Sequence, residues 1–302
     1  MKQPINKDSN SKYFRLKVME DSLLFDFLKT KLSQQSISSI KLLLKNKNIL
    51  LNNNQIITKF DYLLKSGDEI RIISDKSNKN QAFSHPKLKI IFEDDSIIVI
   101  HKREGLLSVG TLKHEEETAY NILNKYIKLT NKQNRIYLLH RLDRDTSGIM
   151  MFAKNQSIQS LLQSNWNEYI VERTYIAIVY GTPVISHDTI TTYLTEDKST
   201  KMHSHQNEVG QKAITSYKTL KTNGKYSLLS LELQTGRKNQ IRIHLQSIGN
   251  PIVGDQKYGN QKDKQERLFL HAQILAFKHP ITNEINRFET PIPKSFLEWI
   301  EK

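Results

Sequence analysis

Polar and charged side chains crowd into one short segment, LHRLDRDTSG, which runs from Leu139 to Gly148 between two apolar segments. It supplies two carboxylates, Asp143 and Asp145, at positions i and i+2. Retaining glycoside hydrolases use two carboxyl groups about 5 Å apart, and a loop could bring these two that close. Loops at strand ends are also where binding and catalytic sites are commonly built. A salt-bridged turn without a catalytic role is the competing interpretation.

A second polar segment, QTGRKNQIRIH, runs from Gln234 to His244. Its Thr235-Gly236 pair predicts a turn. After this turn, apolar side chains fall on one face of a helix that Gly249 would end, namely Ile241, Leu245 and Ile248. Arg242 would lie in the first turns of this helix. The residues allow either a functional arginine or an amphipathic helix with a solvated one.

The elements that must position these two segments include more strands than helices. Strands are expected at 90–92, 97–100, 136–139, 148–153, 175–179, 212–219 and 226–233, and helices at 119–127 and 158–166. Asn155 is placed to cap the second helix. Strands and helices do not alternate regularly, which favours a mixed α+β domain over a doubly wound fold. The chain has no glycine-rich phosphate loop or dinucleotide fingerprint.

The first part of the chain shows a separate, smaller pattern over residues 14–73. Apolar residues at helical spacing are followed by short strands and two polar turns, Asn52-Asn53-Asn54 and Ser66-Gly67-Asp68. Residues 74–87 contain almost no apolar side chains and predict a linker. We therefore expect a module over residues 14–73, a linker over 74–87 and a larger domain over 88–302.

Composition narrows the possible functions. The chain has 302 residues, a net charge of +14 and no cysteine. A basic surface attracts phosphates through counterion release, although a compositional bias toward lysine and asparagine would give the same charge. The absence of cysteine excludes disulfides, thiolate catalysis and zinc-finger sites. No apolar run approaches the ~20 residues of a membrane span and the start has no signal-peptide core, so we expect a cytoplasmic protein.

One polar stretch contains residue types that bind metals, namely His203, His205 and Glu208. The stretch predicts a loop, and the spacing of the three residues does not match a metal-ligand pattern. We therefore expect no metal site.

Several segments, in the expected order, resemble the motifs of RluA-type RNA pseudouridine synthases. HRLDRDTSG resembles the signature of this family, and TGRKNQIRIHL resembles its later motif, which usually has a His where this chain has Asn239. ERTYIAIVYG and FLHAQILAFKHP resemble two of its strands. HKREGLLSV resembles the strand and turn that open the catalytic domain, with Lys102-Arg103 in place of the usual Lys-Pro pair. The resemblance covers roughly residues 88–300.

This resemblance implies an isomerase that converts specific uridines in RNA to pseudouridine on a mixed, largely antiparallel sheet, without a cofactor. It makes Asp143 the catalytic carboxylate and Arg242 its charge partner. Tyr175 would stack on the base and remove the C5 proton, and Leu270 would line the uracil pocket. Arg141 would enter the space that the flipped-out uridine leaves in the RNA. Asp143 would attack C1′, stabilise positive charge there or abstract a ribose proton, and each route needs an ionised carboxylate.

Residues 14–73 resemble an S4 RNA-binding module. The basic residue usual near the start of its second helix is missing here, because Ser38, Ser39 and Ile40 occupy that stretch. Lys41 and Lys45 are therefore the expected RNA contacts. Family members with a separate module of this kind commonly act on large-subunit ribosomal RNA. Transfer RNA is the alternative target. A non-catalytic RNA-binding assembly factor and a glycoside hydrolase are the competing functions. The sequence does not define the oligomeric state, and a monomer is expected.

Overall fold

The computed structural model describes residues 13–32, 40–41, 43–44, 48–52, 55–73, 83–110, 117–259, 265 and 267–301. The chain divides into two units, Met1–Ala82 and Phe83–Lys302, and each has a hydrophobic core of its own. Residues 74–82 of the predicted linker lie outside the described residues. Phe83 packs its ring against Tyr126 of the second unit, with 5.1 Å between the ring centroids.

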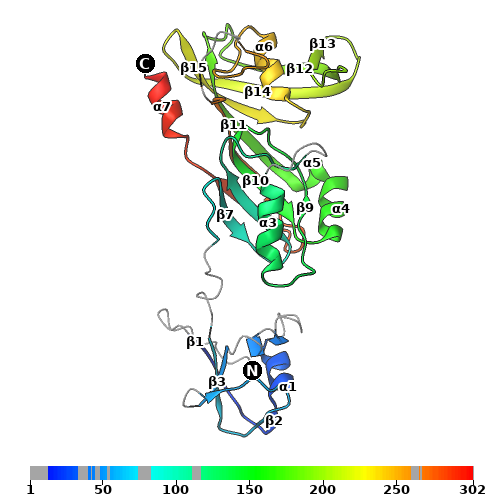
Figure 1. The fold of residues 1–302 in the computed structure, drawn as a ribbon, viewed down its shortest axis with the longest axis vertical. Helices are drawn as coiled ribbons and strands as arrows, with labels where there is room; N and C mark the ends of the chain where they lie inside the picture. The colour runs from blue at the N-terminus through cyan, green and yellow to red at the C-terminus, as the bar shows by residue number, and fades with distance from the viewer. Residues whose placement is uncertain are drawn as a thin grey trace. The chain divides into compact units, whose positions relative to one another are not determined.

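The first unit is a small α/β arrangement (Figure 1). Its main sheet has the order β1-β6-β3-β4, and a second pair joins β2 to β5. Helix α1 buries Phe27 and Leu28, and the helical residues Ile40 and Leu44 join them in the core, as their spacing predicts. The elements are β1 Tyr13–Lys17, β2 Ser22–Leu23, α1 Leu24–Lys31, β3 Ile49–Leu51, β4 Gln55–Ile56, β5 Leu63–Leu64 and β6 Glu69–Ile73.

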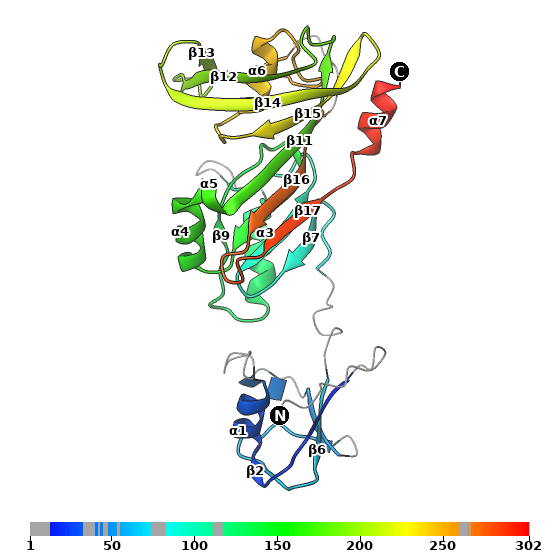
Figure 2. The ribbon, with the colours of Figure 1, turned by 180° about the vertical axis from the view of Figure 1, so that it is seen from behind.

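The second unit is built on one long mixed sheet. Its strand order is β13-β12-β14-β15-β11-β16-β10-β8-β7, with β17 beside β16 and β9 beside β10. Figure 2 shows β11, β16 and β17 running side by side through the middle of this unit. The strands are β7 Leu88–Glu93, β8 Ile97–Lys102, β9 Tyr137–Leu138, β10 Ser147–Ala153, β11 Ile170–Tyr180, β12 His187–Glu196, β13 Met202–His205, β14 Gln211–Thr222, β15 Tyr226–Leu233, β16 Leu270–Lys278 and β17 Ile285–Glu289.

Five described helices pack on this sheet: α3 Ala119–Lys128, α4 Gln156–Ser164, α5 Trp166–Tyr169, α6 Gln240–Ser247 and α7 Lys294–Ile300. Helix α6 packs on β13 and β14, whereas α4 packs on β10. The cap predicted for α4 is confirmed, since the Asn155 side chain accepts a hydrogen bond from the Ile158 backbone N–H. Few helices on a mostly antiparallel sheet confirm the predicted α+β class.

One strand pair sets the geometry of the site. Strands β10 and β16 run parallel, with Ser147 beside His271 and Gly148 beside Ala272, whereas the other strand pairs described in this sheet are antiparallel. The loop that precedes β10 carries Asp143, and β16 begins at Leu270. Because parallel strands begin at the same edge of a sheet, Asp143 and Leu270 are brought to one edge.

Two local predictions are wrong. Trp166 does not continue the preceding helix, because that helix ends at Ser164 and Trp166 opens the short helix α5. His203 and His205 do not lie in a loop, because they belong to β13, which pairs with β12. Cross-strand hydrogen bonding compensates for the lack of apolar side chains in this polar stretch.

Candidate active site

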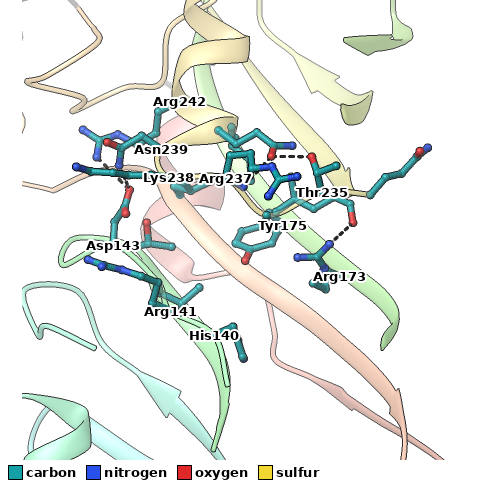
Figure 3. A pocket seen from close by; sticks show the side chains of 18 of the residues that line it. His140, Arg141, Asp143, Arg173, Tyr175, Thr235, Arg237, Lys238, Asn239 and Arg242 are labelled. Carbon is teal, nitrogen blue, oxygen red and sulfur yellow. Dashed lines mark hydrogen bonds and ion pairs between the residues drawn. The ribbon is translucent and has the colours of Figure 1, made fainter. Parts of the chain in front are cut away.

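A cavity of about 560 Å³ opens where the loop before β10, strand β11, the turn before α6 and the start of β16 meet. Figure 3 shows Asp143 next to Asn239 and Arg242, with Arg141 below it and Tyr175 to its right. Leu270 also lines the cavity. The structure therefore brings Asp143, Tyr175, Arg242, Leu270 and Arg141, all predicted from the sequence, to one place.

The loop that carries Asp143 is fixed by two buried polar residues. Ser108 Oγ donates to the Leu142 carbonyl at 2.7 Å and accepts from the Leu142 N–H at 3.0 Å. Lys102 Nζ donates to the carbonyl oxygens of Arg144 at 3.0 Å and Leu106 at 2.8 Å. Burial lowers the pKa of Lys102 to about 8. Both contacts restrain the backbone on either side of Asp143.

Arg242 holds two carboxylates at once. Its Nη1 donates to Asp143 Oδ2 at 3.1 Å, while Nε and Nη2 donate to the two oxygens of Asp255 at 2.7 and 2.8 Å. The Asp255 side chain is 0% exposed, against 26% for Asp143 and 13% for Arg242. Burial alone would lower the pKa of Arg242, but the ion pairs with Asp255 and Asp143 raise it above its ordinary value. The arginine is thus a fixed cation beside a partly exposed carboxylate.

Tyr175 and Leu270 form the apolar side of the cavity. Tyr175 lies on β11, paired with Leu231 of β15 and Ala272 of β16, and its side chain packs between two hydrophobic clusters. Burial raises the pKa of Tyr175, and the Asp143 charge adds to this effect while Arg173 opposes it. Leu270 is buried. Such a surface suits the face of a planar base.

The rim of the cavity is basic. Arg141, Arg237 and Lys238 line it and are exposed to solvent. Exposed cations around a cavity attract phosphate groups. An anionic polymer is therefore the kind of ligand that the rim favours.

Sequence reasoning missed two members of the site, Asp255 and the role of Asn239. Asp255 lies in the segment GDQKYG, where a single acid between turn residues gives little signal. In the sequence, Asn239 stands out only as a departure from the family motif, yet its Nδ2 donates to Asp143 Oδ2 at 2.6 Å. The replacement of the family's usual His by Asn239 is the sequence feature that could have pointed to this role.

Among the described residues, no group of three His, Asp or Glu side chains is arranged to hold a metal ion. His203 instead pairs with Asp197 at 2.8 Å, and His205 bonds to Thr195 at 2.8 Å. Within the same residues, no helix is both long and apolar enough to cross a membrane.

Comparison with known proteins agrees with this geometry. A family model described as RNA pseudouridylate synthase matches residues 96–247. YhcT of Bacillus subtilis, an uncharacterized RNA pseudouridine synthase, is 32% identical over 273 residues, covering 89% of each chain. Ribosomal large subunit pseudouridine synthase D of Borreliella burgdorferi is 34% identical, covering 76% of this chain and 74% of its own.

The fold is similar to that of a solved human protein, RNA Pseudouridylate Synthase Domain Containing 4. The TM-score is 0.58 at 24% identity, and the match covers 70% of this chain and 91% of the human one. Fold and sequence together define an RNA-modifying isomerase. The chain belongs to the RNA pseudouridine synthase family, of the RluA type that its motifs predict.

Proposed function

We propose that Asp143 is the catalytic carboxylate with which this synthase isomerises uridine. In this reaction the C1′–N1 bond breaks, a C1′–C5 bond forms, C5 loses a proton and N1 gains one, so atoms and charge balance. The observation that carries the proposal is the contact of Arg242 with Asp143 inside the cavity. A guanidinium stabilises the ionised carboxylate that attack at C1′, charge stabilisation and proton abstraction all need.

Tyr175 and Leu270 are proposed to hold the flipped-out uracil. A base seated in the cavity would meet the Tyr175 ring and the apolar Leu270 side chain, both of which line it. The Tyr175 hydroxyl is the proposed acceptor of the C5 proton. Because burial raises the pKa of Tyr175, the hydroxyl is protonated in the free enzyme at neutral pH, so this role requires loss of its proton after substrate binds.

Arg141 is proposed to occupy the space that the flipped uridine leaves in the RNA. It is exposed at the rim, two residues from Asp143 in the chain. A guanidinium can stack on neighbouring bases and pair with phosphates. Both properties support insertion into a helix from which one base has been removed.

Large-subunit ribosomal RNA is the proposed target, with transfer RNA as the alternative. Relatives named ribosomal large subunit pseudouridine synthase D are 34% identical in Borreliella burgdorferi and in Haemophilus ducreyi. A ribosomal substrate would place the activity in the cytoplasm. Mapping pseudouridines in a strain that lacks the gene would identify the missing position and distinguish the two targets.

Residues 14–73 are proposed to form an S4-like RNA-binding domain. Support comes from a small core separate from that of the catalytic unit and from Lys41, which is exposed on a helical segment. Lys45, the second proposed RNA contact, lies outside the described residues. RNA binding by this unit would add affinity without supplying catalytic groups.

The substitution Asp143→Asn tests the proposal directly. The amide keeps the shape of the side chain but loses its charge, so isomerisation should fall below detection while RNA binding persists. Total RNA from a deletion strain, labelled with tritium at C5 of uridine, provides the substrate, and tritium release measures turnover. Activity within tenfold of the wild type would remove Asp143 from the mechanism.

A further inference from the structure

The two oxygens of Asp143 have different surroundings. Oδ2 accepts hydrogen bonds from Asn239 Nδ2 at 2.6 Å and from Arg242 Nη1 at 3.1 Å. In the part of the chain that the structure describes, no side chain or backbone N–H donates to Oδ1. One oxygen is therefore anchored, and the other is left for a ligand.

A chain of hydrogen bonds fixes which way the Asn239 amide faces. The Met202 N–H donates to Tyr258 Oη at 3.0 Å, so the Tyr258 hydroxyl is left to donate to Asn239 Oδ1, 3.1 Å away. Burial raises the pKa of Tyr258, which keeps this hydroxyl protonated. The amide NH₂ must then face Asp143, where an ionised carboxylate can only accept.

The backbone of Asn239 supports the same conclusion. Asn239 immediately precedes α6 and has a left-handed conformation with φ of 55°, which asparagine adopts more readily than most residues. Its side chain makes no hydrogen bond to the helix N-terminus, since a capping residue normally has an extended backbone. The amide is directed at Asp143 instead.

We propose that Asn239, oriented by Tyr258, is a positioning residue that acts with Arg242 to fix Oδ2 of Asp143 and to present Oδ1 to the ribose of the bound uridine. This inference rests on the proposed catalytic role of Asp143. Two donors on one oxygen restrict rotation of the carboxylate about its Cβ–Cγ bond. Small losses of alignment at a reacting atom cost large factors in rate.

Asn239 could instead matter only for its left-handed backbone, and two substitutions separate the roles. Asn239→Asp keeps the size and the tolerance of positive φ, but it replaces the donor with a second carboxylate beside Asp143. Asn239→Ala removes the donor without adding charge. A backbone role predicts that Asp is tolerated better than Ala, whereas a donor role predicts the reverse.

The expected result concerns kcat more than KM. Asn239→Ala should lower kcat by roughly tenfold or more, Asn239→Asp should lower it further, and KM for the labelled RNA should stay within about threefold. Asn283→Asp is the matched control, because Asn283 is also left-handed, with φ of 60°, and is exposed on the turn between β16 and β17. It should leave kcat unchanged.

Tyr258→Phe tests the same series of hydrogen bonds at a residue one step further from Asp143. Loss of the hydroxyl frees the Asn239 amide, so kcat should fall, but less than in Asn239→Ala. Tyr217→Phe is its control, since Tyr217 donates to the Ile185 carbonyl at 3.1 Å and does not line the cavity. Thermal unfolding of each variant shows whether the fold is retained, and Tyr258→Phe decides the question if an Asn239 variant does not fold.

Parallel assays of Asp143→Asn separate the two proposals. An active Asp143→Asn overturns the proposed function, and with it the positioning role. An inactive Asp143→Asn, together with Asn239→Asp as active as or more active than Asn239→Ala, overturns the positioning role alone. Wild-type kcat in Asn239→Ala or in Tyr258→Phe also overturns it.

Discussion

Arg242 uses three guanidinium nitrogens on two carboxylates, which a lysine cannot reproduce. Arg242→Lys keeps the charge, but one ammonium should be unable to pair with both carboxylates, so either Asp255, which is buried, or Asp143 should lose its ion-pair partner. Complete loss of a buried ion-pair partner costs roughly 3–5 kcal/mol, so we expect a smaller loss of unfolding free energy than this, together with a large fall in kcat. Chemical denaturation and tritium release measure the two effects.

The control for this change is another bridging arginine. Arg287 contacts Glu172 at 3.1 Å and Glu289 at 2.6 Å, but it is 47% exposed and lies outside the cavity. Arg287→Lys should change the unfolding free energy by less than about 1 kcal/mol and leave kcat intact. Equal effects of the two substitutions would show that Arg242 has no special role.

Tyr175→Phe tests the hydroxyl of the cavity tyrosine. The ring is kept, so RNA should still bind, but product formation should drop sharply if the hydroxyl takes the C5 proton. Because burial raises the pKa of Tyr175, the base form is scarce at neutral pH and becomes more abundant as pH rises. The single-turnover rate of the wild type should therefore increase from pH 7 to 9, and this increase should vanish in Tyr175→Phe. Wild-type rates in the variant would show that Tyr175 contributes only packing and that its hydroxyl has no catalytic role.

The sequence predicted the site residues that lie in segments dense in polar side chains. Asp143 and Arg242 lie in such segments, and a family resemblance suggested that they pair. Asp255 could not be predicted, because its importance comes from two buried oxygens that face Arg242 across a turn. The Asn239–Tyr258 contact joins residues 19 positions apart, and a hydrogen bond between loops has no periodic signal.

At the scale of elements, Gly148 permits the parallel pairing of β10 and β16. Its φ is +122°, and a Cβ there would lie 2.1 Å from the carbonyl oxygen of Ala272. Gly148→Ala should force the two strands apart and displace both the Asp143 loop and Leu270. We expect loss of most activity together with a fall in unfolding free energy of several kcal/mol or more, measured by denaturation.

Gly224→Ala is the matched control for this strand contact. Gly224 also has a positive φ, +86°, but a Cβ there would meet no atom within 4 Å. Only backbone strain is added, which costs roughly 1–2 kcal/mol, and kcat should be unchanged. If Gly148→Ala were no worse than Gly224→Ala, the close approach of β10 and β16 would not matter.

Elements with a strong local pattern were predicted, and those that depend on distant pairing were not. Strands β8 and β10 are continuous apolar runs, and α3 and α4 have capped, amphipathic sequences. By contrast, β13 and β17 are short edge strands with few buried side chains. Their hydrogen bonds to β12 and β16 stabilise them, and neighbouring residues in the sequence do not reveal such partners.

At the scale of the whole molecule, positive charge is shared equally between the two units. Residues 1–82 contain 15 Lys and Arg against 8 Asp and Glu, a net charge of +7, which is half of the +14 of the chain. The groups proposed for catalysis all lie in the second unit. If the first unit binds RNA, the two units contribute different things: one adds phosphate contacts and the other performs the chemistry.

Deletion of residues 1–82 therefore should separate affinity from catalysis. The remaining unit keeps its own hydrophobic clusters and Phe83, which packs on Tyr126, so it should fold and retain its single-turnover rate at saturating RNA. Each lost phosphate contact should reduce the slope of log affinity against log salt concentration by ~0.7–0.9. If Lys41 contacts a phosphate, Lys41→Gln in the full chain should reduce this slope by the amount expected for one contact. An unfolded truncation, or one with an unchanged slope and unchanged target choice, would refute the division of roles.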